Sequence, residues 1–198
     1  MSAAGRLLEA FTAYCTARGG DRRLAAFLEG FDWAMAEREL AAQRLPVVER
    51  LAEVTPPART EERTLLAALA AAAPALHWAQ TYSAADFGED FLRGYGWVEL
   101  FGTRGHFDSA VMAGGFLLLG PGIHYPDHHH IAEEIYIPLT SGSHWSKDGG
   151  PFEPRMAGDL IHHPSAIRHA MKTEREPLAA LYLWRGGPLA QKSVISRD

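Results

Sequence analysis

The sequence predicts a mainly β protein whose core is a jelly-roll β-barrel, covered by helices from the N-terminal part of the chain. Up to about residue 78, apolar residues recur at the spacing of amphipathic helices. From about residue 79, short runs of aromatic and β-branched residues alternate with Gly, Pro, Asp and Ser. The 198 residues, 47% of them hydrophobic, suffice for one domain with a covering layer. We therefore expect a helical segment at residues 1–78 that packs on a β-barrel at residues 79–198.

Three helices are expected in the first segment. The first spans residues 4–18, and its apolar stripe consists of Leu7, Leu8, Phe11, Tyr14 and Cys15. Asp21 is expected to cap a second helix that continues to about Gln43. Thr60 is expected to open a third, Ala-rich helix that runs to Pro74.

Seven strands are expected in the second segment, where helical spacing disappears. They are residues 96–101, 115–119, 134–139, 144–146, 159–162, 169–172 and 178–184. The stretch 146–150 contains Asp-Gly and predicts a turn between strands. Many short strands at such spacing are typical of a sandwich or barrel of the jelly-roll kind.

Composition restricts the classes of partner. A formal charge of −5 and a sequence pI near 6.0 argue against nucleic-acid binding and favour a small-molecule ligand. The single cysteine, Cys15, excludes an intramolecular disulfide. We see no signal peptide, and the longest apolar run, residues 65–73, is short of the ~20 residues of a membrane span. A cytoplasmic protein with no membrane partner is expected, and the sequence does not distinguish a monomer from a homodimer.

The stretch from Gly122 to Gly142 has the pattern of a metal site. His128, His130, Glu134 and Tyr136 are all even-numbered, so on one continuous strand they would point to the same face. The opposite face would be apolar, with Ile131, Ile135, Ile137 and Leu139. Imidazoles and a carboxylate that converge are ligands for a divalent transition metal. A solvated His-rich loop is the alternative, but such a loop needs no isoleucine at alternate positions.

Two stretches together resemble the cupin motifs. The first matches Gly-X5-His-X-His-X3-Glu-X6-Gly through Gly122, His128, His130 and Glu134, with Gly142 one residue late. The second matches Gly-X5-Pro-X-Gly-X2-His-X3-Asn through Gly158, Pro164 and His169. Ala166 stands where the motif has Gly, and Thr173 stands where it has Asn. Neither position is a ligand, so the departures concern turn geometry.

Residues around the motifs resemble a particular cupin family, the bacterial cupin-type dimethylsulfoniopropionate (DMSP) lyases. The likeness covers about residues 95–187. It rests on Tyr125-Pro-Asp-His-His-His, Ala-Glu-Glu-Ile-Tyr136, Asp148-Gly-Gly-Pro-Phe, His162-His-Pro-Ser and Ala180-Leu-Tyr-Leu-Trp-Arg-Gly. Members of this family cleave DMSP, a small zwitterionic sulfonium compound, to dimethyl sulfide and acrylate.

The resemblance implies roles for individual residues. The implied metal ligands are His130, Glu134 and His169, with His128 as a further ligand or close neighbour, and the ion is Zn, Fe, Mn, Ni or Co. Tyr136 is implied as a metal-proximal catalytic tyrosine and Tyr125 as a second tyrosine of the pocket. We interpret His129, His162 and His163 as surface or outer-shell groups.

These roles are consistent with β-elimination. A Lewis-acidic metal that binds the substrate carboxylate would stabilise the charge that develops as a tyrosine takes the α-proton, and we favour Tyr136 over Tyr125 for that step. The aromatic faces of Trp184, Tyr182 and Trp145 can attract the sulfonium, or they can simply fill the core. Two alternatives stay open, a cupin dioxygenase or isomerase and a non-catalytic cupin that binds a small ligand.

Overall fold

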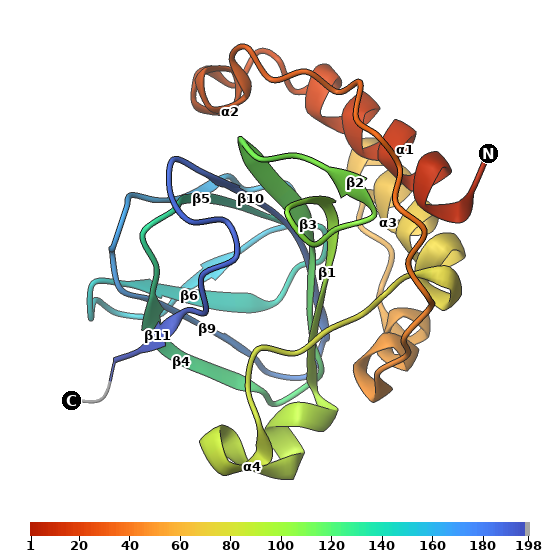
Figure 1. Cartoon of the computed structure of the whole chain (residues 1–198). Coiled ribbons are helices and arrows are strands. Elements are labelled where there is room, and N and C mark those ends of the chain that lie inside the picture. Colours follow the sequence, from red (N-terminus) through yellow and green to blue (C-terminus); the bar gives the residue numbers. More distant parts are fainter. Residues whose placement is uncertain (197–198) are drawn as a thin grey trace.

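The structure is a computed structural model that describes residues 1–196. Within them, two β-sheets face each other as the walls of a barrel (Figure 1). The first sheet contains, in spatial order, β2 (Phe107–Asp108), β1 (Tyr95–Gly102), β3 (Met112–Leu119), β10 (Leu178–Arg185), β5 (Glu133–Pro138) and β8 (Ile161–His163). The second contains β11 (Val194–Ile195), β4 (His124–His129), β9 (His169–Thr173), β6 (Ser143–Lys147) and β7 (Glu153–Arg155). The predicted mainly β class is confirmed.

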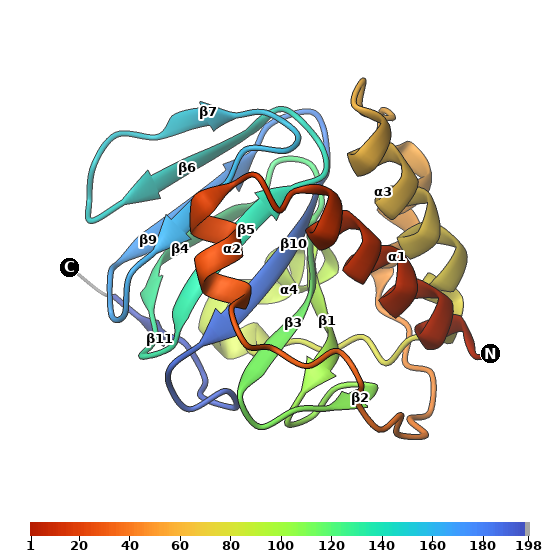
Figure 2. The same ribbon diagram turned by 90° about the horizontal axis from the view of Figure 1, so that it is seen from above.

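Helices cover the outer face of the six-stranded sheet and one end of the barrel. They are α1 (Ala3–Ala17), α2 (Arg22–Leu28), α3 (Thr60–Ala72) and α4 (Ala84–Arg93), with the 3-10 helices η1 (Pro46–Glu53) and η2 (Ala73–Ala75). Figures 1 and 2 show α1 and α3 side by side next to the sheet, and α4 at one end of the barrel. No helix of the described part of the chain is long and apolar enough to cross a bilayer.

Side-chain alternation divides the six-stranded sheet between two cores. Facing the helices are Ala179, Leu181 and Leu183 of β10 together with Ile135 and Ile137 of β5. Facing the barrel interior are Leu178, Ala180 and Tyr182 of β10 together with Tyr136 of β5. The helices therefore bury the apolar face of the same strands whose other face lines the interior.

The first and third predicted helices are confirmed, but the second is wrong in length. Asp21 caps α2 as predicted, because its Oδ1 accepts from the backbone N–H groups of Arg23 (3.0 Å) and Leu24 (3.2 Å). The helix ends at Leu28, and Gly30 follows with a φ of 69°. Residues 31–45 are extended or irregular instead, and their aromatic residues pack on β1, with Trp33 5.5 Å from Phe101 between ring centroids. Residues 31–45 therefore bury their aromatic side chains against the sheet instead of continuing the expected helix.

A helix beyond residue 79 was not expected, yet α4 lies there. Ser83, the residue before α4, forms a capping box with Asp86. The Ser83 backbone N–H donates to Asp86 Oδ2 (2.8 Å), and the Ser83 hydroxyl donates to the same oxygen (2.9 Å). Gly88, at a φ of 82°, interrupts the helix, which hides its periodicity in the sequence. Phe91 on its buried side packs on Tyr95 and closes that end of the barrel, with ring centroids 4.9 Å apart.

All seven predicted strands are present, but the single strand expected through the histidine-rich stretch is wrong. It is two strands of different sheets, β4 and β5, joined by a turn at residues 130–132. Ile131 lies in that turn and is 48% exposed, so it is not part of the apolar face. The predicted Asp-Gly turn is confirmed between β6 and β7, where Asp148 and Gly149 have φ angles of 52° and 71°.

A buried ion-pair cluster ties the helices to the barrel. Glu62 of α3 is fully buried, and its Oε1 accepts from the Tyr14 hydroxyl (2.8 Å) and lies 3.3 Å from Arg18 Nη1. The same Arg18 nitrogen donates to the backbone oxygen of Gly158 (2.7 Å). Gly158 belongs to the turn that precedes β8. The N-terminal helices therefore hold a loop of the barrel as well as its outer face.

We expect Arg18→Met to lower the free energy of unfolding by about 2 kcal/mol, because it leaves the buried Glu62 carboxylate with fewer partners. Arg50→Met is the matched control, since Arg50 pairs with Glu53 on the exposed surface and its loss should cost less than about 0.5 kcal/mol. Urea denaturation of both variants measures the difference. An Arg18 variant no less stable than the Arg50 variant would show that the cluster does not stabilise the fold.

Candidate functional site

Three imidazoles surround one carboxylate oxygen inside the barrel. Glu134 Oε2 lies 3.2 Å from His130 Nε2, 3.2 Å from His163 Nδ1 and 3.2 Å from His169 Nε2. All four side chains are buried. They come from both sheets and from the turn between β4 and β5, so the site exists only when the two sheets have closed on each other.

Backbone hydrogen bonds fix the tautomers of the imidazoles. Nδ1 of His128, His130 and His169 lies 2.9, 2.8 and 3.0 Å from the carbonyl oxygens of Pro126, Ala132 and Ile167 respectively. A carbonyl only accepts, so Nδ1 donates in each case and Nε2 of the neutral ring keeps its lone pair. Imidazoles with Nε2 free and oriented are the usual ligand form of histidine.

The residues fit a divalent transition metal. One ligand atom each of His130, Glu134 and His169 can be chosen so that all three lie within 4.8 Å of one another. His169 Nε2 is buried without a hydrogen-bond partner among the described residues. The Nε2 lone pair of His169 faces Glu134 Oε2 at 3.2 Å, an arrangement that is repulsive unless a cation lies between the two atoms, and tetrahedral ligands at ~2.0–2.1 Å from a metal are about 3.3 Å apart. Two nitrogens and one oxygen do not distinguish Zn, Fe, Mn, Ni and Co.

The electrostatics of the site favour an ionised Glu134 and neutral His128 and His163, whereas burial of His130 is outweighed by the charge of Glu134 and a hydrogen bond with it, which raise the pKa of His130. Burial alone would raise the pKa of Glu134, but the charge of His130 and hydrogen bonds from the imidazoles hold that pKa well below its usual range. Burial lowers the pKa of His128 well below its usual value and that of His163 to about 4. Glu134 therefore presents the ionised form that a metal ligand requires, and a metal would displace the proton that Glu134 favours on His130.

The structure places both His128 and His163 next to the metal-ligand candidates. His128, implied as a further ligand or neighbour, lies outside the group of His130, Glu134 and His169, although its ring centroid is 4.1 Å from that of His169. His163 was interpreted as a surface or outer-shell group, and the structure places it in direct contact with Glu134 because β8 pairs with β5 there. His162 points the other way, to Glu133 and Arg23.

The two motif departures have local explanations. Ala166, in the place of a motif glycine, adopts a left-handed φ of 60°, and its N–H donates to the carbonyl oxygen of His130 (2.9 Å). The turn is therefore retained, with the strain that a Cβ brings in this region. Thr173 replaces the motif asparagine, and its hydroxyl donates to Gly120 O (2.6 Å) and accepts from Ile123 N–H (3.0 Å). Both substitutions keep the loops of the site in place.

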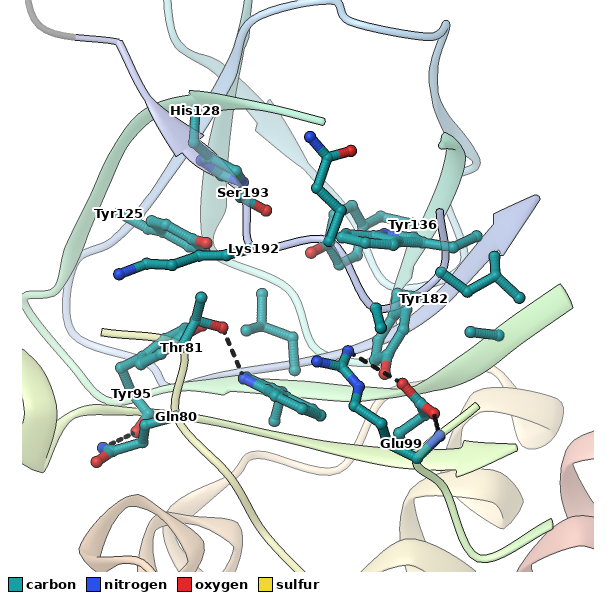
Figure 3. Close-up of a pocket in the computed structure, with 18 residues that line it drawn as sticks. Gln80, Thr81, Tyr95, Glu99, Tyr125, His128, Tyr136, Tyr182, Lys192 and Ser193 are labelled. Carbon is teal, nitrogen blue, oxygen red and sulfur yellow. Dashed lines mark hydrogen bonds and ion pairs between the residues drawn. The ribbon is translucent and has the colours of Figure 1, made fainter. Parts of the chain in front are cut away.

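Figure 3 shows a cavity of about 240 Å³, and three residues of its lining, His128, Tyr136 and Trp184, contact the imidazole cluster. Barrel residues that line it include Tyr125, His128, Tyr136, Tyr182 and Trp184. Two segments outside the barrel strands complete the wall, residues 80–81 and residues 189–193. A space of this size holds a small molecule.

Both predicted catalytic tyrosines line the cavity. Tyr136 is buried on β5, and burial followed by the charge of Glu134 and a hydrogen bond with it raises the pKa of Tyr136 well above its usual value. Tyr125 stacks on His128, with ring centroids 3.9 Å apart, and its hydroxyl lies 2.9 Å from that of Tyr82. Of the two, Tyr136 is thus the tyrosine whose pKa Glu134 affects, and Tyr125 belongs to an aromatic wall.

The three aromatic residues predicted for substrate binding have different surroundings. Trp184 donates its indole N–H to Glu134 Oε1 (2.5 Å) and lies 4.0 Å from His130 between ring centroids. Tyr182 lines the cavity beside it. Trp145 is not part of the lining, because it lies behind Tyr136 with ring centroids 5.0 Å apart. Trp184 and Tyr182 therefore reach the cavity, and Trp145 supports Tyr136.

Comparisons with known proteins show the family and the fold of the chain. A family model for dimethylsulfoniopropionate lyase matches residues 20–180. The DMSP lyase DddQ of Ruegeria pomeroyi is 36% identical over 119 residues, which are 60% of this chain and 59% of that relative's length. Its crystal structure superposes with a TM-score of 0.87 at 29% identity and covers 98% of this chain and 96% of that chain.

Two further solved structures are similar. A crystal structure from the DMSP lyases RdDddP and RnDddQII gives a TM-score of 0.90 at 31% identity and covers 98% of each chain. A cupin-2 domain of Rhodospirillum rubrum gives 0.50 at 17% identity over 63% of this chain and 78% of that chain. At that identity the second match concerns the fold alone, and it is consistent with the predicted cupin barrel.

We expect His130→Ala, Glu134→Ala and His169→Ala each to lose bound metal, because each removes one of few protein ligands. His124→Ala, at an exposed position of the same strand region, is the matched control and should keep the metal content of the unmodified protein. Elemental analysis of purified protein gives the answer. Full occupancy in any of the three variants would exclude that residue as a ligand.

Proposed function

The chain belongs to the dimethylsulfoniopropionate lyase family, and we propose that it is a carbon–sulfur lyase that cleaves DMSP by β-elimination to dimethyl sulfide and acrylate. One observation carries the proposal beyond family membership. A cluster suited to a divalent metal, His130, Glu134 and His169, adjoins a small cavity into which a buried tyrosine, Tyr136, projects.

The reaction needs three functions from the site. The substrate carboxylate must be held, a proton must leave the α-carbon, and the C–S bond at the β-carbon must break. When bound, a divalent cation supplies a Lewis acid for the carboxylate and a positive charge next to Tyr136. The electron pair of the α-C–H bond becomes the second bond between the α- and β-carbons. The C–S pair leaves with sulfur, so dimethyl sulfide departs neutral and acrylate remains.

Tyr136 is our proposed base for the α-proton. A free phenol has a pKa of about 10, and burial together with Glu134 raises that of Tyr136 further, so the phenol requires a nearby cation to give up its proton. Tyr136 lies two residues after Glu134 on β5 and lines the cavity, which supports this assignment. Tyr125, stacked on His128 and bonded to Tyr82, is better suited to orient the substrate.

The aromatic lining is suited to the leaving group. Trp184 and Tyr182 present ring surface to the cavity, and a sulfonium that lies against these rings would experience cation–π attraction. The buried environment also excludes bulk water, which strengthens such attraction. Because the Trp184 indole N–H also donates to Glu134, Trp184 would orient the carboxylate that holds the metal as well as contact the substrate.

Incubation of the metal-loaded protein with DMSP tests the proposal. We expect dimethyl sulfide in the headspace by gas chromatography and an equal amount of acrylate in solution, both absent from metal-free protein. Oxygen uptake during turnover would instead indicate a cupin dioxygenase. Binding of DMSP without either product would indicate a cupin that binds its ligand without catalysis.

Substitution of the tyrosines tests the assignment of the base. Tyr136→Phe keeps the ring, so fold and metal content should persist while kcat falls by ~100-fold or more, the loss typical of a missing general base. Tyr125→Phe is the matched control and should retain more activity, since it loses only the bond to Tyr82. An active Tyr136→Phe beside an inactive Tyr125→Phe would reverse the assignment.

A further inference from the structure

A buried carboxylate lies in the cavity wall away from the metal-ligand candidates. Glu99 of β1 has a side chain only 3% exposed. Its Oε1 accepts from the backbone N–H of Arg104 (2.6 Å), and its Oε2 lies 3.3 Å from Arg104 Nη2. Among the described residues that line the cavity, Glu99 is the one carboxylate. A buried carboxylate requires a positive partner, and in this structure Arg104 provides it.

Arg104 is held on two sides. Besides facing Glu99, its guanidinium carbon lies 5.1 Å above the centre of the Trp97 ring, within the range of cation–π attraction. The Arg104 side chain is 44% exposed, whereas that of Glu99 is almost fully enclosed. Glu99, Trp97 and Arg104 thus form one corner of the cavity. The Glu99 carboxylate is fixed, the Trp97 indole face lies beside it, and the Arg104 cation has a side chain that reaches solvent.

The corner lies on the same row of the sheet as the proposed base. Glu99 pairs with Gly115, Gly115 pairs with Tyr182, and Tyr182 pairs with Tyr136. Paired residues face the same way, so these four positions point into the barrel, and Gly115 contributes no side chain between Glu99 and Tyr182. In Figure 3 the Tyr182 ring extends toward the Glu99 carboxylate.

Tyr182 connects the two ends electrostatically. Burial raises the pKa of Tyr182 well above its usual value, and the charges of both Glu99 and Glu134 raise it further, while Arg104 opposes them. The phenol is therefore within range of the carboxylate of the corner and of the carboxylate of the metal-ligand group. A zwitterion whose anionic end is near Glu134 would direct its cationic end across Tyr182 toward Glu99.

We propose that Glu99 and Trp97 form the subsite for the cationic group of the substrate, and that Arg104 occupies this subsite as an exchangeable internal cation when no substrate is bound. The inference rests on the proposed function, because it assumes a substrate with separated carboxylate and onium charges. It adds a specificity-determining pair that lies away from the metal. The site would then select its substrate by charge at both ends of the cavity.

Arg104 indicates that the corner binds cations, because its guanidinium is itself a cation that lies against Glu99 and Trp97. A guanidinium and an onium group repel each other, so both cannot share one carboxylate and one indole face. The half-exposed Arg104 side chain has solvent to move into, and its departure leaves Glu99 paired by the substrate instead. The other cation of the lining, Lys192, is held elsewhere, 3.7 Å from Asp86 and 5.2 Å above the Tyr82 ring.

Two unreactive ligands isolate the charge effect. The ligands 3-(trimethylammonio)propanoate and 4,4-dimethylpentanoate have the same shape and the same carboxylate, and they differ only in a nitrogen cation or a neutral carbon at the branched centre. Calorimetric titration of the metal-loaded protein gives a Kd for each. We expect the ammonium ligand to bind about tenfold more tightly, within the range of a partly desolvated cation over an indole and beside a carboxylate.

Variants then assign the preference to the corner. Glu99→Gln should remove most of the preference, whereas Arg104→Gln should tighten the ammonium ligand severalfold and leave the neutral ligand unchanged. Glu49→Gln, an exposed position outside the cavity, is the matched control and should retain the preference of the unmodified protein. The two substitutions are expected to change the affinity for the ammonium ligand in opposite directions. Either variant alone therefore tests the subsite if the other does not fold.

Equal affinities of the two ligands in the unmodified protein, or no binding of either, would overturn the subsite. So would an Arg104→Gln variant that binds the ammonium ligand less tightly. Lyase activity is measured separately on the same preparation. Release of dimethyl sulfide with equal affinities would reject this inference alone, and a Glu99-dependent preference without dimethyl sulfide would reject the proposed reaction alone.

Discussion

The contact between Glu134 and three imidazoles is the constraint on which the rest of the structure depends. A buried carboxylate oxygen and a buried imidazole nitrogen whose lone pairs face each other, Glu134 Oε2 and His169 Nε2, are unfavourable in an apolar interior unless a cation joins them. They are nevertheless held there by strands of both sheets and by backbone carbonyls that orient the rings. The barrel therefore holds together a buried His/Glu/His group that is suited to a divalent metal.

The N-terminal helices make this arrangement possible. Strand β5 carries Glu134 and Tyr136 on one face and Ile135 and Ile137 on the other, so its apolar face needs a cover of its own. Helices α1 and α3 provide it, and Arg18 extends from α1 to the turn at Gly158 that leads to β8. The helices contribute no residue to the cavity lining, but they hold the strands that do.

Much of this was predictable because it depends on local pattern. The spacing of His130, Glu134 and His169 and the alternation of strand residues are visible in the sequence, and so is the cap at Asp21. The predictions were wrong where contacts between residues far apart in the sequence determine the local structure. Residues 31–45 leave the helix to pack on β1, the turn at residues 130–132 divides the expected strand, and Gly88 conceals the periodicity of α4. His163 and Glu99 reach the site through strand pairing, which spacing along the chain does not reveal.

The central claim is that one divalent ion binds between His130, Glu134 and His169. A crystal structure of the metal-loaded protein, with anomalous diffraction at the absorption edge of the metal, tests it most directly. We predict a single strong peak at about 2.0–2.2 Å from His130 Nε2, His169 Nε2 and a Glu134 carboxylate oxygen. A peak elsewhere in the barrel, or no peak in protein that analysis shows to contain stoichiometric metal, would contradict the account.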